Sequence, residues 1–163
     1  MPQPATVSDT GPLIALAKVG MLPLLKSLFG MVYIAPAVHR ELLAGEGDDV
    51  ARLQETIGDF IAVIVAPAAD PEVTHSVRDL GRGEQDAIAL AVHTRSVLVI
   101  DDHAARVVAL ALGIPVTGTV GVLIRAKEVG ILPAVSPVLE DMRTKGYWLS
   151  DGLLAIAARL AGE

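Results

Sequence analysis

The sequence has 163 residues and a formal net charge of −6, a size that accommodates one domain with a sizeable hydrophobic core. Hydrophobic residues make up 52% of the chain but aromatic residues only 3%, which indicates a core of aliphatic side chains. The negative charge argues against a broad basic surface for nonspecific nucleic-acid binding, and the absence of cysteine excludes disulfides, thiolate metal sites and thiol nucleophiles.

The apolar runs near the N-terminus do not have the pattern of a membrane segment. The run of residues 11–25, for example, is interrupted by Lys18, Gly20 and Pro23, so it falls short of the ~20 residues that span a bilayer. Residues 1–4 lack a basic segment followed by an apolar one, so we expect no secretory signal. We therefore expect a cytoplasmic protein without a membrane segment, and the lack of cysteine is compatible with that compartment.

Strand and helix patterns alternate along most of the chain. The predicted strands are residues 5–9, 31–35, 60–66, 96–100 and 115–117. The predicted helices are residues 13–20, 22–28, 37–44, 50–57, 71–80, 84–94, 104–112, 120–129, 134–145 and 150–160. This order predicts a doubly wound α/β fold on a parallel sheet, with residues 1–163 forming a single domain. Its core covers residues of about 4–118, and a helical C-terminal extension covers about 119–163.

Acidic residues directly follow two of the predicted strands. Asp9 ends the first strand, while Asp101 and Asp102 follow the apolar run of residues 97–100. Ligands of open parallel sheets bind beyond the carboxyl ends of the strands, and neighbouring strands lie ~4.8 Å apart. If these two strands are neighbours, the three carboxylates lie within a few ångströms of one another.

Two further acids lie on predicted helices beside apolar residues. Glu41 shares a helix face with Ala37 and Val38, which we expect to point inward, although it could also be a surface residue of a short helix. Asp86 precedes the apolar run of residues 87–92, which predicts a helix that is buried all round. Both acids therefore adjoin apolar structure.

Each acid also has a purely structural interpretation. Glu84, which we predict as a secondary site residue, and Asp86 lie in the first turn of a helix, where a carboxylate gains ~0.3 to 1 kcal/mol from the helix dipole. Asp9 could be a turn residue or a helix cap, and either Asp101 or Asp102 could cap the helix that follows. The argument for a site depends on the fact that four separate segments place acids at corresponding ends of the fold.

Grouped carboxylates repel one another, and either a divalent cation or proton uptake relieves the repulsion. Ligands that are all oxygen favour Mg²⁺ or Mn²⁺ over zinc or copper. The histidines show no metal-ligand spacing, and we interpret them as surface or packing residues: His39, His75, His93 and His103. The sequence therefore predicts a magnesium or manganese site without imidazole ligands.

Four motifs together resemble those of the PIN-domain nucleases. They are the segments Val7 to Ile14, Pro36 to Leu43, Gly81 to Ala91 and Leu98 to Arg106. The resemblance extends to residues 113–123 and the helical tail, so it covers nearly the whole chain. It is strongest to the prokaryotic predicted nucleic-acid-binding PIN proteins, which are related to VapC-type toxins. It implies an α/β/α three-layer sandwich on a parallel sheet and a Mg²⁺- or Mn²⁺-dependent ribonuclease.

The resemblance also implies roles for particular residues. The family's first three acids match Asp9, Glu41 and Asp86, and its fourth falls at Asp101 or Asp102. Thr10 matches a hydroxyl residue that often follows the first acid, where it could hold a water or a phosphate oxygen. Many toxins have Thr-Asn-Asp at the fourth acid, but this chain has Ile-Asp-Asp, so the threonine hydroxyl is missing and a carboxylate is added.

These matches lead to the hypothesis of an endoribonuclease that hydrolyses RNA phosphodiesters as the toxin of a toxin–antitoxin pair. Asp9, Asp86 and Asp101 or Asp102 would hold one or two cations, and Glu41 would contribute directly or through water. The RNA backbone would contact arginines near the acids in sequence, namely Arg40, Arg82, Arg95 and Arg106, each of which could equally be a surface residue. The resemblance adds a homodimer and a small antitoxin protein as partners.

Two other classes of function compete with the nuclease. One is a catalytically silent PIN-like module that binds nucleic acid or regulates a partner without cutting. The other is a phosphatase or receiver domain with a phosphorylated aspartate, but Gly11 stands where such a phosphatase needs a second aspartate, and residues 116–118 lack a receiver's lysine.

A homodimer is also predicted from residues 13–28, which carry more apolar side chains than one buried stripe absorbs.

Overall fold

The computed structural model describes residues 4–163, so residues 1–3, on which part of the secretory-signal argument depends, lie outside it. The described residues form a parallel sheet in the order β3-β2-β1-β4-β5. The strands are β1 (Thr6–Ser8), β2 (Val32–Ile34), β3 (Ile61–Val63), β4 (Val97–Val99) and β5 (Val116–Thr117). Each of the five predicted strands is present and is shorter than predicted.

Within residues 4–163, ten helices surround this sheet, and each corresponds to a predicted one with ends that differ by at most three residues. They are α1 (Thr10–Lys18), α2 (Pro23–Phe29), α3 (Pro36–Ala44), α4 (Asp48–Thr56), α5 (Pro71–Val77), α6 (Arg82–Thr94), α7 (His103–Ala111), α8 (Thr119–Glu128), α9 (Ser136–Thr144) and α10 (Asp151–Leu160). Proline opens α2, α3 and α5, because its fixed φ suits the first helical turn and its missing N–H is not needed there.

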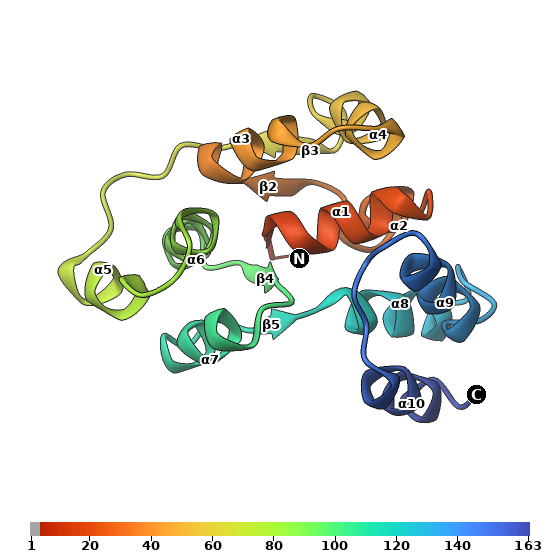
Figure 1. The fold of residues 1–163 in the computed structure, drawn as a ribbon. Coiled ribbons are helices and arrows are strands. Elements are labelled where there is room, and N and C mark those ends of the chain that lie inside the picture. The colour runs from red at the N-terminus through yellow and green to blue at the C-terminus, as the bar shows by residue number, and fades with distance from the viewer. Residues whose placement is uncertain (1–3) are drawn as a thin grey trace.

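The helices form layers on both faces of the sheet, which confirms the three-layer α/β/α architecture. Helices α5, α6 and α7 lie on one side, and α1, α2, α8 and α9 lie on the other (Figure 1). Helices α3 and α4 lie toward the β3 edge, and α10 is the peripheral helix below α8 and α9. None of the helices within residues 4–163 has the length and apolar character needed to cross a membrane.

The two strands that end in acids are direct neighbours at the centre of the sheet. Strands β1 and β4 pair in parallel with Ser8 opposite Val99, and the Asp9 N–H donates to the Val99 carbonyl at 2.9 Å. Val7, Leu98 and Val99 are fully buried, as expected for strands covered on both faces. The pairing brings Asp9 and the Asp101 region to the same edge of the sheet.

The apolar side chains of the early helices, from which a homodimer was predicted, are mostly covered within the chain itself. Leu13, Leu16 and Leu25 are fully buried, and Leu24 and Leu28 are nearly so. These side chains are covered within the same chain, because α1 packs on α4, α8 and α9 while α2 packs on α8. Most of the apolar surface behind that prediction is therefore buried within the chain, Ile14 and Met21 stay partly exposed, and the dimer stays a prediction.

Candidate active site

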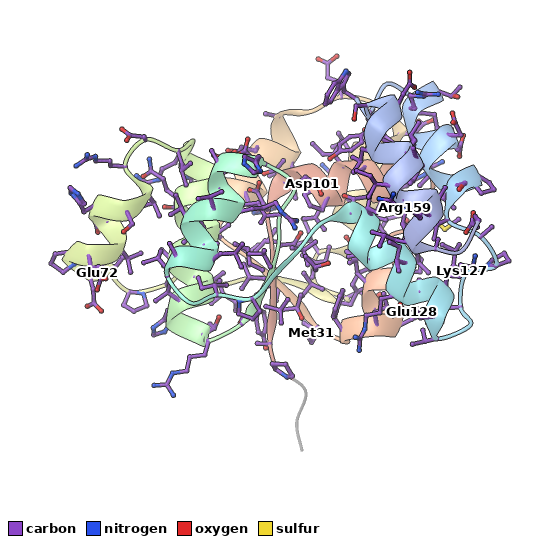
Figure 2. The ribbon with its side chains drawn as sticks, turned by 90° about the horizontal axis from the view of Figure 1, so that it is seen from below. Met31, Glu72, Asp101, Lys127, Glu128 and Arg159 are labelled. Atoms are coloured by element: carbon purple, nitrogen blue, oxygen red, sulfur yellow. The ribbon has the colours of Figure 1, made fainter. Side chains whose placement is uncertain are left out.

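A pocket of about 330 Å³ lies at the carboxyl ends of β1 and β4. Five carboxylates from four segments line it: Asp9, Glu41, Glu84, Asp101 and Asp102. Asp9 follows β1, Glu41 lies on α3, Glu84 lies on α6, and the remaining pair lies between β4 and α7. In Figure 2, Asp101 lies near the middle of the molecule, between the green helices and the blue C-terminal helices.

Asp9 is the most buried of these acids, with 7% of its surface exposed. Its backbone precedes α1, but its side chain does not cap that helix, and its Oδ1 is buried without a hydrogen-bond partner. The pKa of Asp9 is raised to about 6, mainly by burial and in part by the negative charges of Glu84, Glu41 and Asp101. Asp9 therefore lines an acidic pocket and carries a buried oxygen without a hydrogen-bond partner.

Asp101 is held by three hydrogen bonds. Its Oδ1 accepts from the Thr119 N–H at 2.7 Å, and its Oδ2 accepts from the Thr119 hydroxyl at 2.6 Å and from the Tyr147 hydroxyl at 2.5 Å. Burial raises the pKa of Tyr147, as does the adjacent Asp101 charge, so the phenol stays a donor. Because an ionised carboxylate has about four acceptor positions, most of the capacity of Asp101 is used by the protein.

Asp102 has a different role from its neighbour. Its Oδ1 accepts a hydrogen bond from the Ala105 N–H at 2.9 Å, so Asp102 is the acid that caps α7. It also lines the pocket, and its side chain is more exposed than that of Asp101. Capping and a place in the pocket are thus compatible in one residue.

Glu41 and Glu84 meet at the junction of α3 and α6. Glu41 accepts a hydrogen bond from the Thr10 hydroxyl, and Glu84 accepts one from the Gly81 N–H at 3.0 Å as part of a capping box. Burial raises the pKa of Glu84, and the charges of Asp102 and Glu41 add to that shift. A Cβ at Gly83 would lie 2.8 Å from the carboxyl carbon of Glu41, so this carboxylate rests directly on the α6 backbone.

Asp86 lies outside this pocket. It forms an ion pair with Arg82, whose Nε donates to Asp86 Oδ2 at 3.0 Å, and it lines a separate cavity of about 420 Å³. Residues two positions apart on a helix point in different directions, so α6 turns Glu84 toward the other carboxylates and Asp86 away from them. The structure brings together four of the predicted acids, and Glu84 is the fifth.

The four arginines considered for RNA contact separate into two groups. Arg40 and Arg82 line the cavity beside Asp86, and Arg106 donates to the Ile100 carbonyl at 3.0 Å on the other side of the acid pocket. Arg95 directly follows α6 and lies just before β4, so it is at the amino edge of the sheet, opposite the carboxylates. Three arginines therefore flank the pocket and one does not.

The carboxylates fit a divalent cation by their chemistry. All donors are oxygen atoms, and Asp9 Oδ1 is a buried acceptor without a partner. Across residues 4–163, however, no three acidic or histidine side chains are arranged as a group that could hold a metal ion. The other four carboxylates each accept a hydrogen bond from the protein, so a cation would bind as some of those bonds are exchanged.

Two residues that position Asp101 were not singled out from the sequence. Thr119 follows β5, which pairs with β4, so its place at the carboxyl edge could have been inferred from the alternation of strands and helices. Tyr147 lies on the connection between α9 and α10, 46 residues beyond Asp101, and no periodic pattern indicates that it returns to the pocket.

Comparison with known families gives one match that covers nearly the whole chain. A family model for the PIN domain matches residues 5–163. A comparison with curated proteins found no match.

Proposed function

The chain belongs to the PIN-domain family, and on this premise we propose that it is a metal-dependent endoribonuclease that hydrolyses RNA phosphodiesters. PIN domains are generally nucleases that need divalent metals, so the family supports the class of reaction. The observation that carries the proposal is the pocket of five carboxylates around the buried, unpartnered Oδ1 of Asp9.

We assign the metal ligands from the side chains that line this pocket. Asp9, Glu41, Glu84 and Asp102 would hold one or two Mg²⁺ or Mn²⁺ ions, with Glu84 taking the place first given to Asp86. A divalent cation in such a site activates water and offsets the negative charge that develops on the phosphate. Asp101 would mainly hold the shape and the negative charge of the pocket and would not be a principal ligand, because three protein donors already bind its carboxylate.

The remaining roles belong to the residues around the pocket. The Thr10 hydroxyl would orient Glu41 and could contact a phosphate oxygen. Arg40 and Arg82 would contact the RNA backbone on one side of the acids, and Arg106 on the other. Water would attack the phosphorus and the 3′-oxygen would leave, so the products would carry a 5′-phosphate and a 3′-hydroxyl.

The test is cleavage of a mixed panel of single-stranded and looped RNAs with Mg²⁺ or Mn²⁺. We expect EDTA to abolish cutting, and Asp9→Asn and Glu84→Gln to reduce kcat on the order of 100-fold, as when one contact to the transition state is lost. Asp86→Asn is the matched control from the same helical turn, and its rate should stay close to wild type. Analysis of the product ends separates this reaction from contaminating ribonucleases that leave cyclic phosphates.

Other outcomes would overturn parts of the proposal. If the wild-type protein leaves the whole panel intact but still binds RNA, it is a catalytically silent PIN-like binding module, an alternative favoured by the hydrogen bonds that already engage four of the carboxylates. If Asp86→Asn abolishes cutting while Glu84→Gln does not, the assignment of the third acid reverts to Asp86.

In the cell, the proposed ribonuclease would act as the toxin of a toxin–antitoxin pair, a role that rests on the resemblance to VapC-type toxins. It includes a cytoplasmic location, a single domain over residues 1–163, a small antitoxin partner and a homodimer. Induced expression of the wild-type protein should arrest growth, whereas Asp9→Asn should not. Growth arrest by both proteins would show that the effect does not depend on cleavage.

A further inference from the structure

A second cleft continues from the acid pocket. Its volume is about 780 Å³, and it is lined by residues of β5, α8 and α10 and by the connection before α10. Asp101, Asp102 and Tyr147 line both hollows, so the two form one continuous surface. A molecule that fills this cleft therefore lies beside the carboxylates.

Trp148 stands at this cleft and is the only tryptophan in the chain. Its side chain is 83% exposed, more than any other large apolar residue described. The residues on either side are fixed, because Tyr147 bonds Asp101 and Leu149 is buried in the core. The connection thus holds the indole in solvent between two anchored residues, which a side chain with a packing role would not need.

The rest of the cleft combines apolar and basic groups. Leu153 and Ile156 of α10 supply exposed apolar surface. Arg106 and His103 line the side nearest the acids, and the bond from Arg106 Nη1 to the Ile100 carbonyl keeps the guanidinium there. An exposed aromatic side chain and an arginine in one cleft form the combination that binds unpaired nucleotides, through base stacking and contact with the backbone.

We infer that this cleft is a base-binding subsite for single-stranded RNA, in which Trp148 stacks on an unpaired base next to the phosphodiester at the carboxylates. The inference rests on the proposed nuclease function. The net charge of −6 weakens the attraction of the protein to RNA phosphates, so stacking must supply much of the affinity. Paired bases in an RNA duplex do not offer a free face, so the subsite selects single strands.

The sole tryptophan makes binding directly visible. In EDTA, where no cleavage occurs, a short oligoriboadenylate or oligouridylate should quench the fluorescence of the wild-type protein, and an RNA duplex should not. By anisotropy of a labelled oligonucleotide, Trp148→Ala should weaken Kd on the order of 5- to 100-fold, whereas Trp148→Phe should retain most of the affinity. With metal, Trp148→Ala should raise KM and leave kcat nearly unchanged.

A matched control and two contrary results make the test decisive. Val129→Ala removes an exposed apolar side chain at the end of α8, outside the cleft, and should bind RNA as wild type does. If single-stranded RNA is cut but neither quenches Trp148 nor depends on it, the subsite is wrong while the nuclease stands. If wild type is a dimer that Trp148→Ala converts to a monomer, with RNA affinity unchanged, the cleft is an interface between copies and the inference is overturned. Quenching without cutting would reject the nuclease and keep the subsite.

Discussion

Helices α2 and α10 are both rich in leucine, yet they are held by different forces. In α2, Leu25 is fully buried and Leu24 and Leu28 nearly so, beneath α8. In α10, Leu160 is 64% exposed and Ile156 is also exposed. The difference shows that apolar content says how much surface a helix could bury, whereas the place of the helix in the layers decides how much it does bury.

Only Ala157 of α10 is buried, and polar contacts attach the helix at both ends. At its start, the Ser150 hydroxyl accepts from the Leu153 N–H at 3.1 Å. Beyond its end, the Glu163 carboxylate accepts from Lys127 Nζ at 2.8 Å and from the N–H groups of Val135 and Ser136 at 2.7 and 3.0 Å. Burial therefore attaches α2 to the domain, whereas hydrogen bonds and an ion pair contribute most of the attachment of α10.

The largest effect should come from a cavity in the buried helix. Leu25→Ala should lower the free energy of unfolding by about 2 to 5 kcal/mol, because it leaves a void under α8. Leu160→Ala, the same truncation on α10, should change it by less than about 0.5 kcal/mol. Urea unfolding with an unchanged m-value measures both. Equal losses would mean that α10 is covered in solution and would remove the contrast.

A smaller effect should come from the buried acid at the sheet edge. The pKa of Asp9 in the folded protein is about 6, above its ordinary value of 3.8, so folding favours the protonated form. The stability that this protonation contributes is complete below pH 4 and is lost as the pH rises through 6. In EDTA at pH 7.5, Asp9→Asn should therefore be more stable than wild type by up to about 3 kcal/mol.

The same pair of proteins provides the control for that prediction. At pH 4 the wild-type side chain is protonated and nearly isosteric with asparagine, so the advantage of Asp9→Asn should largely disappear. Thermal or urea unfolding across this pH range measures the difference. An advantage that is independent of pH would mean that the burial of charge at Asp9 is not its cause.

The smallest effect should come from the acid that anchors α10, where the pKa shift has the opposite sign. Lys127 and the N–H groups of Val135 and Ser136 lower the pKa of Glu163 to about 2. Its contribution is therefore present above pH 4.5 and is lost as the pH falls through 2. Glu163→Gln should speed amide exchange in α10 at pH 7 with little change in global stability. Unchanged exchange in α10 would show that burial suffices to hold it.

Much of the site could be predicted because it follows from sheet topology. Asp9 and Asp101 each stand directly after an apolar strand, and neighbouring parallel strands deliver their ends to one edge. The order of strands and helices could also be predicted, since proline and glycine mark most element boundaries. Predictions of this kind depend on local pattern and on the chirality of the fold.

The rest depends on rotation about a helix axis and on contacts between distant segments. Glu84 and Asp86 are two residues apart, and an error of half a turn in the helix exchanges which of them faces the pocket. The apolar run after Asp86 indicates a buried helix but does not say which acid is turned inward. Tyr147 reaches Asp101 because of the position in which α9 packs, and the sequence around Tyr147 has no pattern that predicts this position.

Gly83 carries a consequence for variation at this site. The Glu41 carboxylate occupies the space in which any other residue at this position would place its Cβ, so even alanine would displace it. A related chain could therefore keep every carboxylate and still lose the geometry through one added methyl group. Counting acids therefore misses a position that has no side chain and yet sets where one of the carboxylates lies.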